Sequence, residues 1–161
     1  PSLKGHAGLH FNLAHSHELA LIAITALGEI GVDVEHIRAL DGMDQLARVC
    51  FSEQEYQQFH TLPDPEGQQA FFECWARKEA YIKALGEGLS HPLQQFSVTV
   101  LPAQPVRMVS IDGSSEEAAQ WTLQSVDVGA EYTAAFAVRA TSVTTQCWKL
   151  HFNSELAHVS C

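Results

Sequence analysis

Two stretches of the chain place carboxylates inside apolar patterns: Gly31-Val32-Asp33-Val34-Glu35 and Trp75-Ala76-Arg77-Lys78-Glu79-Ala80-Tyr81-Ile82-Lys83. In the first, Val32 and Val34 alternate with Asp33 and Glu35. This alternation predicts a half-buried β-strand with one apolar face and one acidic face. In the second, the spacing of Trp75, Glu79 and Lys83 predicts that charged and apolar side chains share one stripe of a helix. A helix that served only for packing would turn such charges outward, so the pattern indicates a polar site between a strand and a helix.

Three of these carboxylates, Asp33, Glu35 and Glu79, could converge if the helix faces the strand. Mg²⁺ prefers oxygen ligands of this kind, and a nearby Lys83 suits a phosphate. Gly31 supports the idea, since glycine within a strand often marks the close approach of another backbone or a ligand. Two alternatives stay open at this point. The strand could present a solvated acidic face, and Glu79 could form an ordinary surface pair with Lys83 one turn later.

The composition narrows the class of protein. A chain of 161 residues with 46% hydrophobic and 17% charged residues predicts one soluble globular domain. A formal charge of −10, with only nine scattered Lys and Arg residues, argues against a nucleic-acid partner. No apolar run approaches the roughly 20 residues that span a bilayer, so we expect no membrane partner. The four cysteines show no metal-type spacing, and we expect reduced thiols in a cytoplasmic protein.

The order of predicted elements indicates an α+β fold, with an antiparallel sheet packed against a long helix. Helices are expected at about 42–49, 53–60 and 68–85, the second one starting at a Ser52–Glu55 capping box. Strands are expected at 9–14, 19–26, 30–35, 96–101, 106–111, 121–126 and 132–139, the first three as an antiparallel meander. We assign residues 1–139 to the domain and residues 140–161 to a C-terminal strand or tail.

Five motifs in a fixed order give the chain a specific family resemblance: His10-Phe11-Asn12-Leu13-Ala14-His15-Ser16, Ile30-Gly31-Val32-Asp33-Val34-Glu35, Phe51-Ser52-Glu53-Gln54-Glu55-Tyr56, Trp75 to Lys83, and Gly86-Glu87-Gly88-Leu89. The chain resembles the 4′-phosphopantetheinyl transferases, in particular the surfactin-synthetase-activating (Sfp) type. The resemblance implies transfer of the phosphopantetheine arm from coenzyme A to a serine of an acyl or peptidyl carrier protein. It also implies one half of a pseudo-twofold fold, here the C-terminal portion without the N-terminal half. We therefore expect association with that half or self-association.

The resemblance implies a role for each matched residue. Asp33, Glu35 and Glu79 would hold Mg²⁺ or Mn²⁺, while His15 and Lys83 would contact the phosphates of coenzyme A. Glu79 would accept the serine proton, with a metal-bound water or Lys78 as alternatives. Glu55 would have a supporting catalytic role.

Two departures from the family pattern are visible, since Ala14 and Ala76 stand where hydroxyl or thiol side chains are common. A hydroxyl missing at Ala14 would remove one phosphate hydrogen bond, about 1 kcal/mol of ligand affinity. Two other functions compete with the transferase. One is a non-catalytic remnant that docks a carrier protein or partner chain, and the other is a Mg²⁺-dependent phosphohydrolase.

Overall fold

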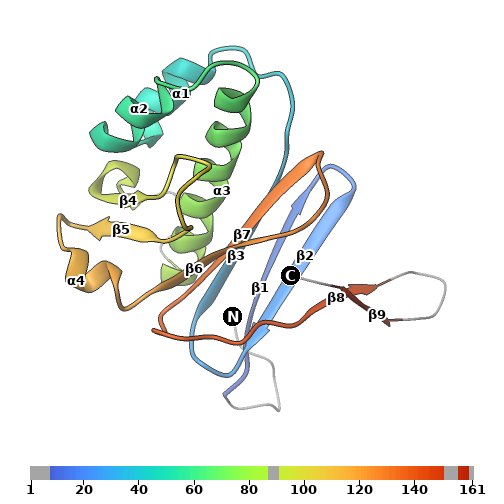
Figure 1. The fold of residues 1–161 in the computed structure, drawn as a ribbon. Coiled ribbons are helices and arrows are strands. Elements are labelled where there is room, and N and C mark those ends of the chain that lie inside the picture. The colour runs from blue at the N-terminus through green and yellow to red at the C-terminus, as the bar shows by residue number, and fades with distance from the viewer. Residues whose placement is uncertain (1–7, 87–90, 151–155, 160–161) are drawn as a thin grey trace.

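A computed structural model describes residues 8–86, 91–150 and 156–159 of the chain (Figure 1). The elements follow in the order β1 (His10–Ser16), β2 (Leu19–Thr25), β3 (Ile30–His36), α1 (Met43–Cys50), α2 (Glu53–Phe59), α3 (Glu66–Leu85), the 3₁₀ turn η2 (Leu93–Gln95), β4 (Phe96–Val98), β5 (Met108–Ile111), α4 (Ser115–Ala118), β6 (Thr122–Val126), β7 (Tyr132–Val138), β8 (Cys147–Leu150) and β9 (Leu156–Val159). These elements confirm the predicted α+β class. No helix among them is long and apolar enough to cross a membrane.

The central sheet has the strand order β3-β7-β6, and α3 lies against one of its faces (Figure 1). The close approach occurs at Gly31, as its position in the strand predicted. A Cβ atom there would overlap the carbonyl oxygen of Ala80 and the amide nitrogen of Ala84, both on the α3 backbone. Small residues of β7, Ala135 and Ala137, join the same core. Glycine and alanine on the sheet therefore allow the helix to sit directly on β3.

The opposite face of the sheet packs on the β1–β2 hairpin. Val32, Val34 and Phe136 are buried there, together with Ala14 of β1. Since successive strand residues point to opposite faces, this arrangement turns Asp33 and Glu35 toward α3. The alternation in the sequence thus set the direction of both carboxylates.

The predicted meander of the first three strands is wrong in its last pairing. β1 and β2 form an antiparallel pair, but β3 pairs with β7, with Asp33 opposite Ala135. Side chains of β1 satisfy part of the remaining edge of β3, since Asn12 Oδ1 accepts from the Val32 amide and Ser16 Oγ from the His36 amide. These side-chain acceptors replace backbone partners, so β1 lies along β3 without a ladder between them.

Helix ends follow their local chemistry. Ser52 caps α2 in the predicted capping box with Glu55, and Gly86 ends α3 in the left-handed conformation with φ 74°. Residues 87–89 of the last motif lie outside the described part of the chain. α4 was not predicted, because it spans only four residues.

In the assigned tail, β8 pairs with β9, and Ala140 and Val143 pack on the core beneath the hairpin. The expectation of four reduced thiols is wrong for Cys147, which is disulfide-bonded, while Cys50 and Cys74 are free.

Candidate active site

The facing surfaces of β3 and α3 bring the predicted carboxylates together. Asp33 is 5% exposed, and its Oδ1 accepts a hydrogen bond from Lys83 Nζ at 2.5 Å. Its second oxygen, Oδ2, is buried and has no hydrogen-bond partner. Glu79 Oε1, from the helix, is likewise buried without a partner. Buried carboxylate oxygens are ordinarily hydrogen-bonded, so two such atoms at one site indicate room for a ligand that donates positive charge.

The electrostatics of this cluster also favour a cation. Burial raises the pKa of Asp33 to about 7; Lys83 opposes this rise, and Glu35 and Glu79 add to it. The pKa of Glu79 is raised mainly by burial, which Lys83 opposes and Glu35 reinforces. Each carboxylate therefore responds to the charge of its neighbours, and three carboxylates face two cations, Lys83 and the more exposed Arg38, so the group lacks positive charge when all three are ionised. The donor set fits Mg²⁺ or Mn²⁺, which take carboxylate oxygens as ligands.

Glu35 is held by two side chains that the sequence did not single out as site residues. Its Oε1 accepts from Trp75 Nε1 at 3.1 Å, and its Oε2 lies 3.9 Å from Arg38 Nη1. The stripe spacing of Trp75 and Glu79 could have indicated the first contact, because both face β3. Arg38 carries no periodic signal, since it follows the end of the strand.

The carboxylates do not yet form a complete metal site. Within residues 8–86 and 91–150, no three Asp, Glu, His or Cys side chains are arranged as a ligand group. The Trp75 indole occupies one oxygen of Glu35, and the Lys83 ammonium occupies one oxygen of Asp33. Binding of a divalent cation would therefore require side-chain rearrangement.

Lys78 and Glu55 lie away from the carboxylates. Lys78 Nζ donates to Glu55 Oε2 at 2.6 Å and to the Phe96 carbonyl at 2.8 Å, with the side chains 0% and 1% exposed. Glu55 also accepts from the backbone amides of Ser52 and Val98. The structure thus gives these two residues a buried ion pair that joins α2, α3 and β4. It does not bring them to the cluster as the catalytic prediction required, because Lys78 leaves the helix about 100° away from Glu79.

His15 lies on β1, the strand that borders β3, and its side chain is exposed. It alternates with the buried Ala14, so it points away from the core beneath the hairpin. Its predicted phosphate contact therefore stays a prediction, from a position that a ligand could reach.

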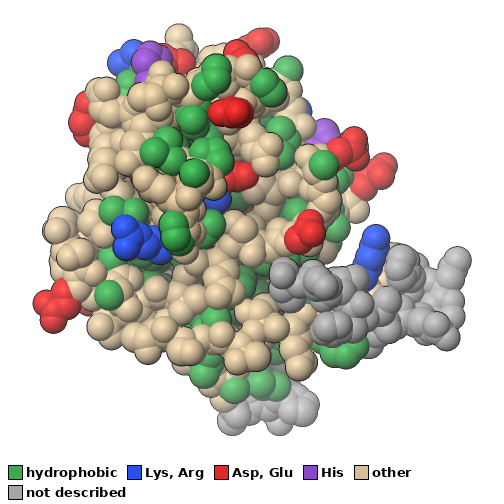
Figure 2. Space-filling view, viewed as in Figure 1, with side chains coloured by type: hydrophobic (Ala, Val, Ile, Leu, Met, Phe, Trp, Pro, Cys, Tyr) green, Lys and Arg blue, Asp and Glu red, His purple; other side chains and the backbone are tan. Residues whose placement is uncertain are grey.

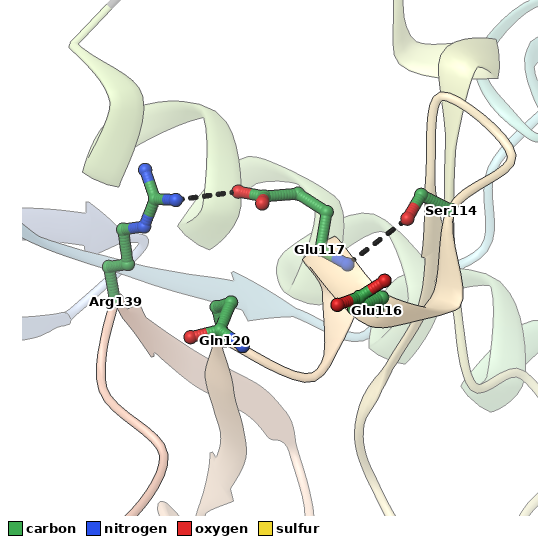
Figure 3. Close-up of a pocket in the computed structure, with 5 residues that line it drawn as sticks. All are labelled: Ser114, Glu116, Glu117, Gln120 and Arg139. Carbon is green, nitrogen blue, oxygen red and sulfur yellow. Dashed lines mark hydrogen bonds and ion pairs between the residues drawn. The ribbon is translucent and has the colours of Figure 1, made fainter.

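Other surface features do not point to a second site. Figure 3 shows a hollow beside α4, where Arg139 pairs with Glu117 and Ser114 accepts from the Glu117 amide. None of the predicted residues lines it. Figure 2 shows the Lys and Arg side chains of this face at separate places rather than in one patch.

A family model described as the 4′-phosphopantetheinyl transferase superfamily matches residues 29–137, more than half of the chain and including both carboxylate-bearing elements. The chain belongs to the 4′-phosphopantetheinyl transferase superfamily. Among curated relatives, it is 33% identical over 142 residues to the 4′-phosphopantetheinyl transferase HetI of Nostoc sp., covering 88% of this chain and 56% of that protein. It is 34% identical over 115 residues to a putative 4′-phosphopantetheinyl transferase of Synechocystis sp., covering 71% of this chain and 45% of that protein.

The fold agrees with this membership of the superfamily. The holo-[acyl-carrier-protein] synthase of Thermotoga maritima superimposes with a TM-score of 0.52 at 19% identity, over 77% of this chain and 70% of that one. The chain spans about half the length of the curated relatives described above.

Proposed function

We propose that this superfamily member takes part in transferring the 4′-phosphopantetheine arm of coenzyme A to a serine of an acyl or peptidyl carrier protein. The observation that carries the proposal is the pair of buried oxygens without hydrogen-bond partners, Asp33 Oδ2 on β3 and Glu79 Oε1 on α3, whose carboxylates lie close enough to affect one another's charge. The serine oxygen would attack the phosphorus that bears the pantetheine arm. The bond to the leaving 3′,5′-ADP would break, and the serine would lose its proton to a base.

The residues of this site suit that chemistry. Asp33, Glu35 and Glu79 would hold Mg²⁺ or Mn²⁺, which when bound offsets negative charge on the pyrophosphate. Lys83 and the exposed His15 would bind phosphate oxygens. Glu79 is the favoured base, since burial raises its pKa and so makes it a stronger proton acceptor at neutral pH. Positioning and charge stabilisation would supply most of the rate enhancement.

We assign Lys78 and Glu55 a different role from the catalytic one predicted. Their buried pair fixes the rotation of α3, and Glu79 follows Lys78 directly along that helix. They would act as positioning residues that keep the Glu79 carboxylate turned toward β3.

We further propose the Sfp-type arrangement, in which a second copy of this α+β unit completes the site. The outer face of the β1–β2 hairpin supports this, since Leu13, Ile22 and Ile24 are 53%, 65% and 59% exposed. Neither strand carries Asp, Glu, Lys or Arg. An uncharged apolar face of this kind is typical of interaction surfaces. The length of the curated relatives, about twice the matched region, agrees with two such units. The site would work in the cytoplasm on coenzyme A.

The transfer is tested by incubating the protein with coenzyme A, Mg²⁺ and an apo carrier protein, then reading the mass of the carrier. We expect the mass of one phosphopantetheine arm to be added, and expect Asp33→Ala to abolish the addition while the domain stays folded. The assay is run in parallel on the chain together with the residues that flank it in its gene. An unmodified carrier in both cases would overturn the transferase proposal.

The second unit is tested by light scattering across a range of concentrations. Ile22→Ser should weaken any association, whereas Val49→Ser, equally exposed but on α1, should not. Equal behaviour of the two variants would remove the hairpin face from the interface.

A further inference from the structure

The Lys83 side chain occupies the place beside Asp33 where a cation would bind. Lys83 belongs to the last turn of α3, four residues after Glu79, and its Nζ lies 2.5 Å from Asp33 Oδ1. Asp33 lies on β3 of the three-stranded sheet with its side chain 7% exposed, whereas the Lys83 side chain is 30% exposed. The carboxylate is therefore held by the sheet, while the ammonium sits on a flexible stem with a route to solvent.

Lys83 satisfies only part of the site. An ammonium has three N–H donors, yet Asp33 Oδ2 and Glu79 Oε1 are buried without hydrogen bonds. A divalent cation can take several oxygens at once, which one ammonium here does not do. The two oxygens that support the metal proposal are thus also the two that Lys83 leaves without a hydrogen bond.

Lys83 occupies an oxygen that a complete ligand group would need. No three potential ligands are gathered in the described ranges 8–86 and 91–150, and within these ranges Asp33 Oδ1 forms its ion pair with this ammonium. Two cations cannot share one carboxylate oxygen without strong mutual repulsion. A metal ion that takes Asp33 through Oδ1, or through both oxygens, must therefore displace the Lys83 ammonium. A metal ion held by Oδ2 alone would still lie beside the ammonium, and the same repulsion would favour its departure.

We propose that Lys83 is an exchangeable counter-ion: it holds Asp33 in place in the metal-free protein, and a divalent cation displaces it from the carboxylate. The inference rests on the proposed metal site and adds to it an order of events. Lys83 would reach phosphate oxygens only after it leaves Asp33. The exchange would couple binding of the metal to release of the Lys83 ammonium from Asp33.

The proposal predicts a ranking of metal affinities in the absence of coenzyme A. Lys83→Met removes the competing charge, and it should bind Mn²⁺ about tenfold more tightly than the parent protein, the size expected for losing one hydrogen bond between charged groups. Lys83→Arg should bind Mn²⁺ several-fold more weakly, because a guanidinium can grip a carboxylate through two parallel hydrogen bonds. Free Mn²⁺ is measured by electron paramagnetic resonance during the titration, with Glu79→Gln as a variant that should lose affinity.

Two outcomes separate this inference from the proposal beneath it. If the parent protein binds Mn²⁺ but Lys83→Met binds it no more tightly, Lys83 is not a competitor and the inference fails alone. If neither protein binds Mn²⁺, the metal site itself fails and the exchange fails with it.

The parent protein also provides a test that needs no substitution. In protein labelled with ¹⁵N-lysine, the ammonium groups of Lys83 and Lys78 are both hydrogen-bonded and should give signals in proton–nitrogen spectra. Mg²⁺ should remove or shift the Lys83 signal and leave the fully buried Lys78 signal unchanged as an internal control. A Lys83 signal that persists unshifted at saturating Mg²⁺ would overturn the exchange.

Discussion

The buried pair of Lys78 and Glu55 allows a catalytic role to be separated from a structural one. Lys78→Met keeps the length of the side chain and removes its charge. The lysine side chain is fully buried, makes hydrogen bonds of 2.6 Å and 2.8 Å, and lies with its ammonium 4.2 Å from the centre of the Phe96 ring. The substitution leaves the Glu55 carboxylate buried without its counter-ion.

The expected loss of unfolding free energy in Lys78→Met depends on how well the remaining Glu55 carboxylate is stabilised. Breaking a buried ion pair by removing one partner costs about 3–5 kcal/mol. Glu55 keeps two backbone donors, the Ser52 and Val98 amides, each at 2.7 Å. These donors continue to stabilise the carboxylate, so we expect Lys78→Met to lose unfolding free energy at the lower end of this range, about 3 kcal/mol. This is a large fraction of the stability of an ordinary domain, roughly 5–15 kcal/mol.

The assay is urea denaturation of the parent, Lys78→Met, Glu55→Gln and the double variant. The double variant removes both charges, so its cost should fall short of the sum of the single costs by more than about 1 kcal/mol. Lys149→Met, an exposed control, should change the free energy of unfolding by less than about 0.5 kcal/mol. A cost below about 1 kcal/mol for Lys78→Met, with carrier modification abolished, would refute the structural reasoning and restore Lys78 as a catalytic candidate.

Three further predictions concern the contact between β3 and α3. Gly31→Ala should cost about 1–3 kcal/mol of unfolding free energy and weaken Mn²⁺ binding, because the new methyl group meets the α3 backbone. Gly42→Ala, whose Cβ would find only Gln45 Oε1 at 3.7 Å, should lose about 1–2 kcal/mol through its left-handed backbone and leave Mn²⁺ binding unchanged; equal Mn²⁺ affinities of the two variants would contradict the steric argument. In metal-free protein, the raised pKa of Asp33, about 7 in the fold against 3.8 as its ordinary value, should make the free energy of unfolding fall as pH rises from about 4 to 7. The folded state binds more protons than the unfolded state in that range. The stability that protonated Asp33 contributes is therefore complete below its ordinary pKa and is lost as pH rises through its pKa in the folded protein. Urea denaturation at pH 5 and 7.5 should show this fall in the parent and a smaller one in Asp33→Asn; a parent with no such fall would be evidence that Asp33 is already ionised at pH 5. Mg²⁺ should bind more tightly at pH 8 than at pH 6, because it requires the deprotonated carboxylate; affinity measured by calorimetry that is the same at both pH values would argue against Asp33 as a ligand.

The sequence predicted the direction of the β3 carboxylates better than it predicted the pairing of the strands. The period-2 pattern around Asp33 placed both β3 carboxylates on one face, and that face does meet α3. It could not identify β7 as the partner of β3, since any strand with an apolar face would satisfy the same pattern. The acceptors Asn12 and Ser16, which support the other edge of β3, give no periodic signal at all.

Helical rotation explains why the structure separates Lys78 from the carboxylates. Neighbours along a helix differ in direction by about 100°, so Lys78 points toward Glu55 and β4 while the adjacent Glu79 does not. Lys83, four residues after Glu79, returns to the same face. The i, i+4 spacing places Lys83, and not Lys78, on the helix face of Glu79.

The sequence by itself determined the local features: an acidic and an apolar face on β3, a long helix ended by Gly86, a capped α2, and the ordered motifs of the superfamily. These features depend on side-chain period, backbone preference and residue chemistry, all of which are set by residues close together in the sequence. Only the tertiary structure decided which polar atoms are paired and which are left without partners. That distinction depends on contacts across about fifty residues, as between Asp33 and Lys83, and on how deeply packing removes each atom from water.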